Sequence, residues 1–296
     1  MRFLHGWVVS FSLLAWLLAV VPAVAQPTDS TTTHATPAGQ LVSLYNKWEI
    51  SPSLTSVILN TDLRVDASNG DFGTTIDAED DLGLATVKLQ PRIDARLRLG
   101  RKHELEGGFQ FAERTGETVL QRDIDFADTT FVAGASLNST LNTNLLFLNY
   151  RYAIIAKDRT QAGVGVGFGA LFFSMELDAL SSGGISVSYS ASKSLTAPVG
   201  SLGLYGRFLM GTRWSAETDA RFVKLRIDRF HIRYLEANLA GRYFLSRKVG
   251  LELGGGLDAV EVDVDPRLSV GDADYGPSSQ VKFSLTNVRL GVVYIP

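Results

Sequence analysis

Apolar and small residues alternate strictly along the segment 161–177. One face of a strand through it would carry Ala162, Val164, Val166 and Phe168, and the opposite face would carry glycines. A period of two residues with one fully apolar face is the pattern of a strand that contacts lipid on one side. The segment therefore predicts one strand of a transmembrane β-barrel.

Similar segments recur down the chain. Each is at least the roughly 9 to 11 residues that a tilted strand needs to cross a bilayer, and turn residues follow it. They predict an all-β fold, a transmembrane antiparallel up-and-down β-barrel of ten strands, with eight or twelve strands as alternatives. The predicted strands are 54–66, 84–99, 103–115, 142–155, 160–177, 195–210, 212–227, 230–245, 249–264 and 280–295.

The connections between these strands alternate between tight turns and long loops. The expected long loops are 67–83, 116–141, 178–194 and 265–279. Outer-membrane barrels have short periplasmic turns and longer external loops, so both termini are expected on the periplasmic side. The loop 116–141 itself alternates, so it either prolongs its two strands as a hairpin or adds two spanning strands.

The first residues indicate the compartment. Residues 1–25 combine Arg2, an apolar run and the triplet Ala23-Val24-Ala25, as a secretory signal peptide does. Residues 26–52 are rich in threonine and proline and predict a flexible periplasmic segment. The barrel is expected over 53–296. A signal peptide followed by a barrel predicts the outer membrane of a Gram-negative bacterium.

Polarity inverts partway along several predicted strands. Up to Phe222 the outward positions of its strand are mainly apolar, but beyond it Lys224 and Arg226 point outward while Val223 and Leu225 point inward. Outside the hydrocarbon region an apolar outer face is no longer favoured, whereas an apolar inner face can pack as a core. The inversion predicts a hydrophobic plug in the external half of the barrel.

In the membrane half the inward positions are charged, with both signs mixed. Buried charges persist when they are paired, so an ion-pair lattice is expected, with Arg96 and Arg98 opposite Glu104 and Glu106. Wide diffusion pores use about 16 to 18 strands, which argues against a pore here. The predicted luminal charge network consists of Arg64, Arg92, Asp94, Arg96, Glu104, Glu106, Arg151, Arg207, Glu217, Asp219, Arg221, Glu236, Arg242 and Arg289.

A tight turn at 246–248 predicts a charged ladder on the outer surface. It pairs Arg233 with Glu261, His231 with Asp263, and Arg229 with Asp265. Such a ladder either keeps two strands in register or binds lipopolysaccharide phosphates and their bridging cations. In the second case the phosphate contacts are Lys224, Arg226 and Arg233.

No cofactor is expected. The chain has a formal net charge of −3 and lacks cysteine, which argues against a nucleic-acid partner and excludes disulfides and thiolate metal sites. The loop carboxylates Asp77, Glu79, Asp80 and Asp81 could bind divalent cations, but their spacing fits no known calcium loop, and a solvated loop is the simpler interpretation.

Catalysis is not expected. Beyond the signal sequence the histidines are His34, His103 and His231. His231 with the nearby Asp228 is reminiscent of the ten-stranded omptin surface proteases, but the alternation points His231 outward rather than into a cleft. Lipid-hydrolysing barrels pair a lipid-facing histidine with a serine, and no serine adjoins His231.

The segments 73–84, 91–94 and 122–126, which read GTTIDAEDDLGL, PRID and RDIDF, resemble a group of uncharacterised outer-membrane β-barrel proteins of proteobacteria. The resemblance covers most of the chain and implies location and fold, without an activity. The last strand ends in Tyr294-Ile295-Pro296, where such barrels commonly end on an aromatic residue that the barrel-insertion machinery reads.

Together these features predict a non-enzymatic barrel with a plugged, charged lumen and acidic external loops. It would contact outer-membrane lipid and lipopolysaccharide and serve envelope structure, adhesion or lipid organisation. The alternative is a narrow gated channel for a small solute, which would need a continuous polar path. A surface hydrolase is the third hypothesis.

Overall fold

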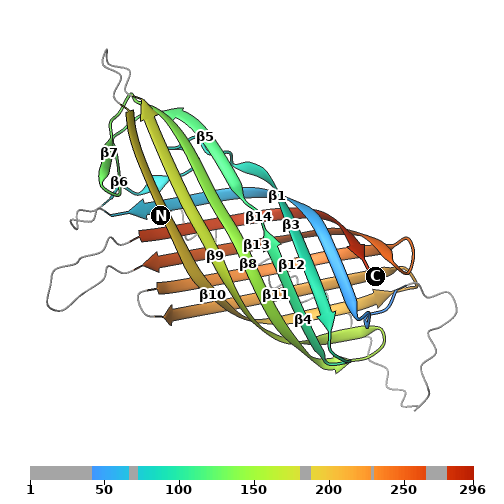
Figure 1. Ribbon diagram of the computed structural model, residues 1–296. Coiled ribbons are helices and arrows are strands. Elements are labelled where there is room, and N and C mark those ends of the chain that lie inside the picture. The colour runs from blue at the N-terminus through green and yellow to red at the C-terminus, as the bar shows by residue number, and fades with distance from the viewer. Residues whose placement is uncertain (1–41, 67–72, 181–187, 228–229, 265–278) are drawn as a thin grey trace. The chain divides into compact units, whose positions relative to one another are not determined.

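A computed structural model describes residues 42–66, 73–180, 188–227, 230–264 and 279–296. The predicted signal peptide lies outside these residues, and so do both members of the predicted pair of Arg229 with Asp265. The described strands form an antiparallel barrel that closes where the last strand pairs with the first (Figure 1). The ten-strand prediction is confirmed. The wall consists of β1 (Trp48–Val65), β3 (Val87–Arg98), β4 (His103–Gln110) continued by β5 (Glu113–Val119), β8 (Ser136–Ala156), β9 (Thr160–Leu180), β10 (Ser188–Met210), β11 (Trp214–Ile227), β12 (Phe230–Phe244), β13 (Val249–Val264) and β14 (Ser279–Tyr294).

The loop 116–141 prolongs its neighbouring strands and adds no spanning strands. β5 pairs with the first part of β8, and the short strands β6 (Ile124–Phe126) and β7 (Thr129–Phe131) form a separate hairpin. The twelve-strand alternative is therefore wrong. One further short strand, β2 (Ile76–Asp77), pairs with β1.

The two ends of the barrel differ. At the tight-turn end, only a few residues connect consecutive strands. In one of these turns Gly211 adopts a left-handed φ of 76°, which glycine permits. The long-loop end carries the remaining connections. β9 and β10 reach Leu180 and Ser188, so the connection expected over 178–194 is much shorter. β1 begins at Trp48, before the expected barrel boundary at 53.

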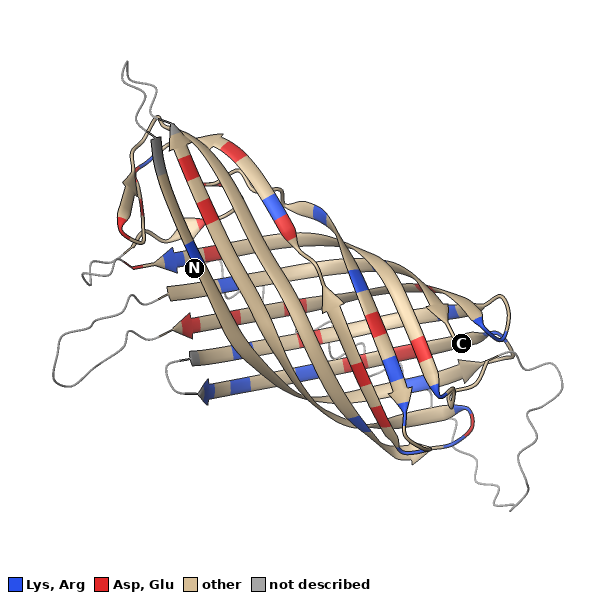
Figure 2. Ribbon diagram, viewed as in Figure 1, with Lys and Arg blue, Asp and Glu red and all other residues tan. Residues whose placement is uncertain are grey.

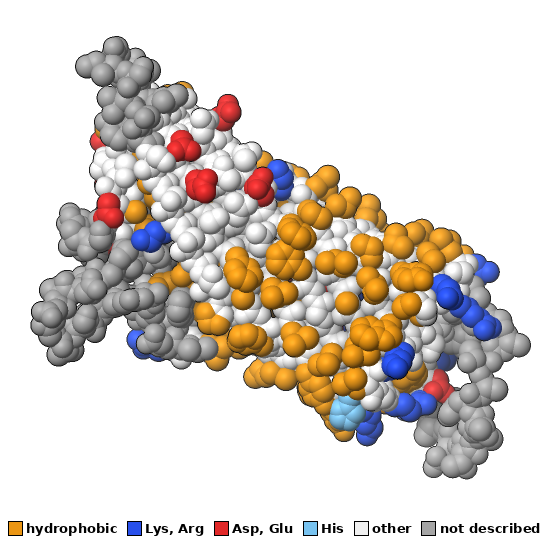
Figure 3. Space-filling view, in the orientation of Figure 1, with side chains coloured by type: hydrophobic (Ala, Val, Ile, Leu, Met, Phe, Trp, Pro, Cys, Tyr) orange, Lys and Arg blue, Asp and Glu red, His pale blue; other side chains and the backbone are white. Residues whose placement is uncertain are grey.

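An apolar belt surrounds the outside of the barrel, as the orange side chains in Figure 3 show for one face. Its large side chains are well exposed, with Phe168 at 68%, Leu290 at 64% and Leu202 at 63%. An outward apolar band on a closed barrel is the pattern of a wall that faces lipid. Among the described residues, no helix is long and apolar enough to cross a membrane.

The described residues form three buried apolar clusters. The plug consists of Leu171, Ala197, Val199, Ile232, Val260, Val262 and Val264, on the inward faces of β9, β10, β12 and β13. The loop cap lies at the long-loop end and joins strand residues such as Leu63 and Met175 to loop residues such as Leu82 and Phe126. The strap cluster lies at the tight-turn end, where Val42 and Leu44 pack on Leu209, Phe244 and Val293.

On β1 the predicted inward face is wrong. Thr61, Leu63 and Val65 are buried, whereas the intervening Arg64 is partly exposed and pairs with Asp66, with Nε and Oδ1 3.0 Å apart. The polarity of β1 inverts at its long-loop end, just as it does in β11, and the sequence interpretation missed this inversion. Arg64 therefore does not belong to the luminal network.

Candidate functional site

Between the plug and the strap cluster, the lumen is filled by charged side chains, which we call the charge layer. Every wall strand except β9 contributes a charged side chain to it, and β9 contributes the amide of Gln161, which accepts from Arg98 at 3.2 Å. Alternation directs every second side chain inward. Figure 2 shows both signs distributed over the strands. Its members are Glu49, Arg92, Asp94, Arg96, Arg98, Glu104, Glu106, Asn149, Arg151, Tyr205, Arg207, Glu217, Asp219, Arg221, Glu236, Asn238, Arg242, Glu252, Asp258 and Arg289.

Glu104 is the most enclosed acid of the charge layer, with no exposed surface. Arg207 on β10 donates two parallel hydrogen bonds to it, with Nη2–Oε1 at 2.6 Å and Nη1–Oε2 at 2.8 Å. Arg98 donates from the neighbouring strand at 2.5 Å. A two-pronged arginine–carboxylate pair is among the stronger polar contacts in proteins, so β4 and β10 are joined across the lumen.

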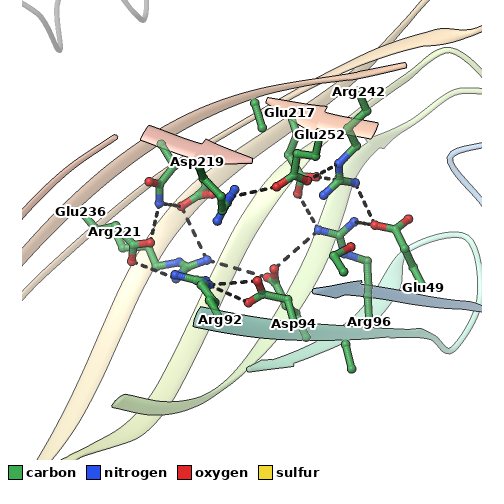
Figure 4. A pocket seen from close by; sticks show the side chains of 16 residues that line it. Glu49, Arg92, Asp94, Arg96, Glu217, Asp219, Arg221, Glu236, Arg242 and Glu252 are labelled. Carbon is green, nitrogen blue, oxygen red and sulfur yellow. Dashed lines mark hydrogen bonds and ion pairs between the residues drawn. The ribbon is translucent and has the colours of Figure 1, made fainter. Parts of the chain in front are cut away.

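Glu217 is the second junction of the charge layer (Figure 4). Its Oε1 accepts from Arg96 at 2.8 Å and from Arg151 at 3.0 Å, and its Oε2 lies 3.1 Å from Nη1 of Arg242. These arginines come from three different strands. A carboxylate shared in this way compensates several buried cations at once.

A further group lies nearer the plug. Arg221 pairs with Glu236, with Nη1 and Oε2 2.9 Å apart, while Arg92 pairs with Asp94 at 2.9 Å. The hydroxyl of Tyr234 donates to Glu236. Tyr234 also packs against the plug, so it joins the polar and apolar parts of the lumen.

The predicted pairing across the turn between β3 and β4 is confirmed, because Arg96 lies opposite Glu106 and Arg98 opposite Glu104. The sequence interpretation did not include Glu49 or Asp258 among the luminal charges. Glu49 precedes the expected barrel, yet it accepts from Arg96 at 2.7 Å and from Arg242 at 2.8 Å. Glu49 continues the alternate positions of the inward Ser51 and Ser53, and this was the signal that could have placed it.

The spaces described between the luminal side chains are small. One cavity of about 30 Å³ lies within the charge layer beside Ser51, Arg96 and Glu217. A second, of about 60 Å³, separates the charge layer from the plug, between Arg92 and Val260. Each has room for very few water molecules, so neither connects the two ends of the barrel.

Residues 42–47, which we call the strap, close the tight-turn end. The Tyr45 hydroxyl donates to the carbonyl of Lys157 at 2.9 Å, and the guanidinium groups of Arg98 and Arg101 lie 5.1 and 4.5 Å from its ring centre. Partial burial raises the pKa of the Tyr45 phenol above its usual 10.0, which keeps the proton that this hydrogen bond needs.

The acidic loop uses its carboxylates internally. Asp77 accepts from the backbone amides of Glu79 and Asp80, and Asp81 pairs with Arg122 at 2.5 Å. Glu79 pairs with the buried Arg114. Among the described residues no group of three or more potential ligand side chains is placed to hold a metal ion.

The outer ladder has the predicted register, with Arg233 opposite Glu261 and His231 opposite Asp263. Arg233 Nη1 and Glu261 Oε2 are 2.9 Å apart. On β11, Lys224 lies opposite Arg233 and Arg226 lies opposite His231. The side chains of Lys224 and Arg226 are exposed. The pairing accounts for strand register and does not by itself test phosphate binding.

Neither described histidine lies in the charge layer. His103 is at the tight-turn end, where its Nδ1 lies 2.6 Å from the hydroxyl of Tyr150 and its ring meets the edge of Tyr152. His231 lies on β12 among outward-facing charges. His34 falls outside the described residues.

The comparisons establish the fold. No protein-family model matches the chain, and no curated protein matches it. It is similar to the outer membrane protease OmpT of Escherichia coli, with 10% identity, a TM-score of 0.54, and coverage of 86% of this chain and 98% of OmpT. Weaker likenesses include the attachment invasion protein Ail of Yersinia pestis, at 10% identity, covering 84% of this chain and 99% of Ail, with a TM-score of 0.33. The fold is that of Gram-negative outer-membrane β-barrels.

Proposed function

We propose that this protein is an integral outer-membrane barrel, closed to solutes and without catalytic activity, with its long-loop end outside the cell and its termini in the periplasm. It would serve envelope structure, adhesion or lipid organisation. The observation that carries the proposal is the filling of the lumen, in which buried apolar clusters lie on both sides of a paired charge layer. The apolar belt and the fold of outer-membrane barrels support the location.

The surface beyond the apolar belt supports a role in adhesion or display. There β5, β8, β9 and β10 present a polar outward face in register, with Glu117, Asn138 and Asp178 in one row and Thr115, Thr140 and Glu176 in the next. Small hydroxyl and amide groups mixed with carboxylates suit hydrogen bonding to a polar partner. Figure 3 shows the red acidic groups on this face.

Conductance in planar bilayers tests closure. The folded wild-type protein is expected to give no current steps, while a combined variant with Val42→Ser, Leu44→Ser, Ile232→Ser and Val262→Ser is expected to give brief ones. These changes weaken both apolar barriers without removing the charge layer. Steady ion-selective steps from the wild type would overturn the proposal in favour of a gated channel.

A further inference from the structure

The barrel wall has a notch between β10 and β11. Their pairing ends at Leu202 opposite Phe222, although β10 continues to Ser188 along β9 and β11 continues to Ile227 along β12. Figure 1 shows β8–β10 diverging from β11–β14 towards the long-loop end. Pro198 lies in the part of β10 that pairs with β9 but not with β11. Proline has no N–H group to donate, so it is tolerated at such an unpaired edge.

The notch does not open into the lumen. Leu225 closes it, since its Cδ1 lies only 3.0 Å from where a Cβ on Gly200 would stand. Behind it, Ala197 and Val199 are buried in the plug. The outward positions of β10 beside the notch, Pro198 and Gly200, are small in volume and only partly buried, so a ligand that approaches β11 from the outside meets Leu225 in front of Gly200 and no large side chain of β10.

Cationic side chains border the notch. Lys224 and Arg226 project outward from β11, and Arg233 projects outward from β12 directly opposite Lys224. The Arg233 side chain is 57% exposed although it pairs with Glu261, which Lys282 also contacts at 3.1 Å. Among the described residues, the acidic groups beside these cations on the outer surface are Glu261 and Asp263, which belong to β13. The described outward positions of β11 and β12 therefore carry an excess of positive charge.

These cations stand directly above the apolar belt. Phe222, two residues before Lys224, is 60% exposed, and Leu202 beside it is 63% exposed. Groups at the edge of the lipid-facing surface lie at the depth of the headgroups, where a lipid phosphate meets cationic side chains while its acyl chains contact the belt. Arginine and lysine are the side chains that bind such phosphates.

We propose that Lys224, Arg226 and Arg233 bind the phosphates of a phosphorylated glycolipid, lipopolysaccharide, whose headgroup occupies the notch beside Pro198 and Gly200. This rests on the proposed function, because it requires the long-loop end to face the outer leaflet. A peptide strand added to the free edge of β10 would be a different occupant. The charges favour the lipid, because the groups nearest the notch are cations and Pro198 offers no N–H to a strand.

Native mass spectrometry in neutral detergent tests the site with diphosphorylated lipid A. The triple variant Lys224→Gln, Arg226→Gln and Arg233→Gln is expected to bind it about tenfold more weakly than the wild type, or weaker still. The matched control is Arg101→Gln, Lys102→Gln and Lys248→Gln at the tight-turn end, and it should bind like the wild type. Lys224→Gln alone breaks no ion pair among the described residues, so it tests the site even if the triple variant folds poorly. This single variant should lose less affinity for lipid A than the triple variant does.

Further ligands separate the contribution of the phosphates to binding from that of the acyl chains. Dephosphorylated lipid A should bind as weakly to the wild type as lipid A binds to the triple variant, and inorganic pyrophosphate should not compete at equal concentration, because it lacks acyl chains. Equal binding of lipid A by the wild type and the triple variant would overturn the proposal, as would strong competition by pyrophosphate. If the wild type binds an unphosphorylated peptide, and blocking the β10 edge abolishes that binding, the result would overturn the proposal in favour of strand addition. Conductance is a separate measurement, so loss of lipid binding in a silent barrel would refute this site and leave the proposed closure intact.

Discussion

At the scale of single residues, the buried carboxylates balance the arginines. Glu104 has no exposed surface and lies within 3.6 Å of Arg96, Arg98, Arg151 and Arg207. Removing one partner of a buried ion pair is costly because the other charge remains buried without compensation. The stability of the lumen should therefore depend on acids such as Glu104 more than on any surface charge.

Glu104→Gln is expected to lower the free energy of unfolding by about 3–5 kcal/mol, because it leaves the surrounding arginines undercompensated while keeping the side-chain volume. Reversible urea unfolding in lipid vesicles measures the effect. The exposed outward Glu113→Gln is the matched control and should change stability by less than about 0.5 kcal/mol. Equal effects of the two changes would show that the charge layer does not hold the strands together.

The inward residues could be predicted wherever alternation continued unbroken. Arg92, Arg96 and Glu217 lie on strands whose apolar belt positions fix the register. Arg64 was misplaced because the outward side chains of β1 change from apolar to polar near Asn60. From the sequence alone, a polar side chain that faces outward cannot be told from one that faces the lumen. The pairing of Arg207 with Glu104 could not be predicted, since it joins strands that are not neighbours in the wall.

At the scale of elements, the strap is a short segment held mainly by two side chains. Val42 and Leu44 are buried against Leu209, Phe244 and Val293. Burying an aliphatic side chain of this size contributes about 1.5–3 kcal/mol. The strap should therefore open locally before the barrel unfolds.

Val42→Ser with Leu44→Ser is expected to make the bond after the exposed Lys47 sensitive to trypsin while the unfolding of the barrel changes little. Both exchanges remove local apolar contacts and leave the wall pairing intact. Cleavage rate and thermal unfolding are measured side by side. Val119→Ser with Val132→Ser, both at exposed positions, should leave the cleavage rate unchanged. Unchanged protection of Lys47 in the strap variant would contradict the packing described here.

The strap should also loosen at high pH. Burial raises the pKa of Tyr45 above 10.0, so the contribution of its phenol to stability is fully present below pH 10 and declines as pH rises from there through the folded value. Because the activity of trypsin itself changes with pH, the wild type is compared with Tyr45→Phe at each pH. The ratio of the two cleavage rates at Lys47 should stay constant between neutral pH and 9 and increase above pH 10. Tyr45→Phe cannot ionise at this position, so its cleavage should lack this pH-dependent rise.

Some elements could not be read from the sequence. The third predicted strand breaks at Phe111, where β4 ends before β5 begins, because Phe111 and Ala112 leave the ladder between two pairings with β8. The beginning of β10, residues 188–194, was missed because its serines give no apolar face. It is a strand because it pairs with β9, a tertiary contact that overrides a weak local pattern.

At the scale of the whole molecule, the outer surface divides into an apolar belt and a polar region beyond it. Leu253 on β13 is 60% exposed within the belt, whereas Thr115 on β5 is exposed in the polar region. The alternating segments predicted this division. The way the strap and the loop cap fold over the lumen could not be foreseen, because it depends on tertiary contacts that alternation within a segment does not reveal.

Leu253→Arg is expected to destabilise the barrel in vesicles by about 2–4 kcal/mol, because it places a charge against hydrocarbon. Thr115→Arg introduces the same side chain where water covers the surface and should cost less than about 1 kcal/mol. Urea unfolding of the two variants measures the difference. A smaller loss for Leu253→Arg than for Thr115→Arg would place the belt outside the membrane.

The most direct test of the central claim, a lumen sealed at both ends, uses the absence of cysteine from the chain. Ser51→Cys places a single thiol beside the cavity in the charge layer, and Ser246→Cys places one on an exposed tight turn. With a hydrophilic thiol reagent, the thiol at position 51 is predicted to react about a hundredfold more slowly, because it reacts only when the lumen opens. Comparable rates at the two positions would show that water and small solutes enter the barrel freely and would contradict the sealed lumen.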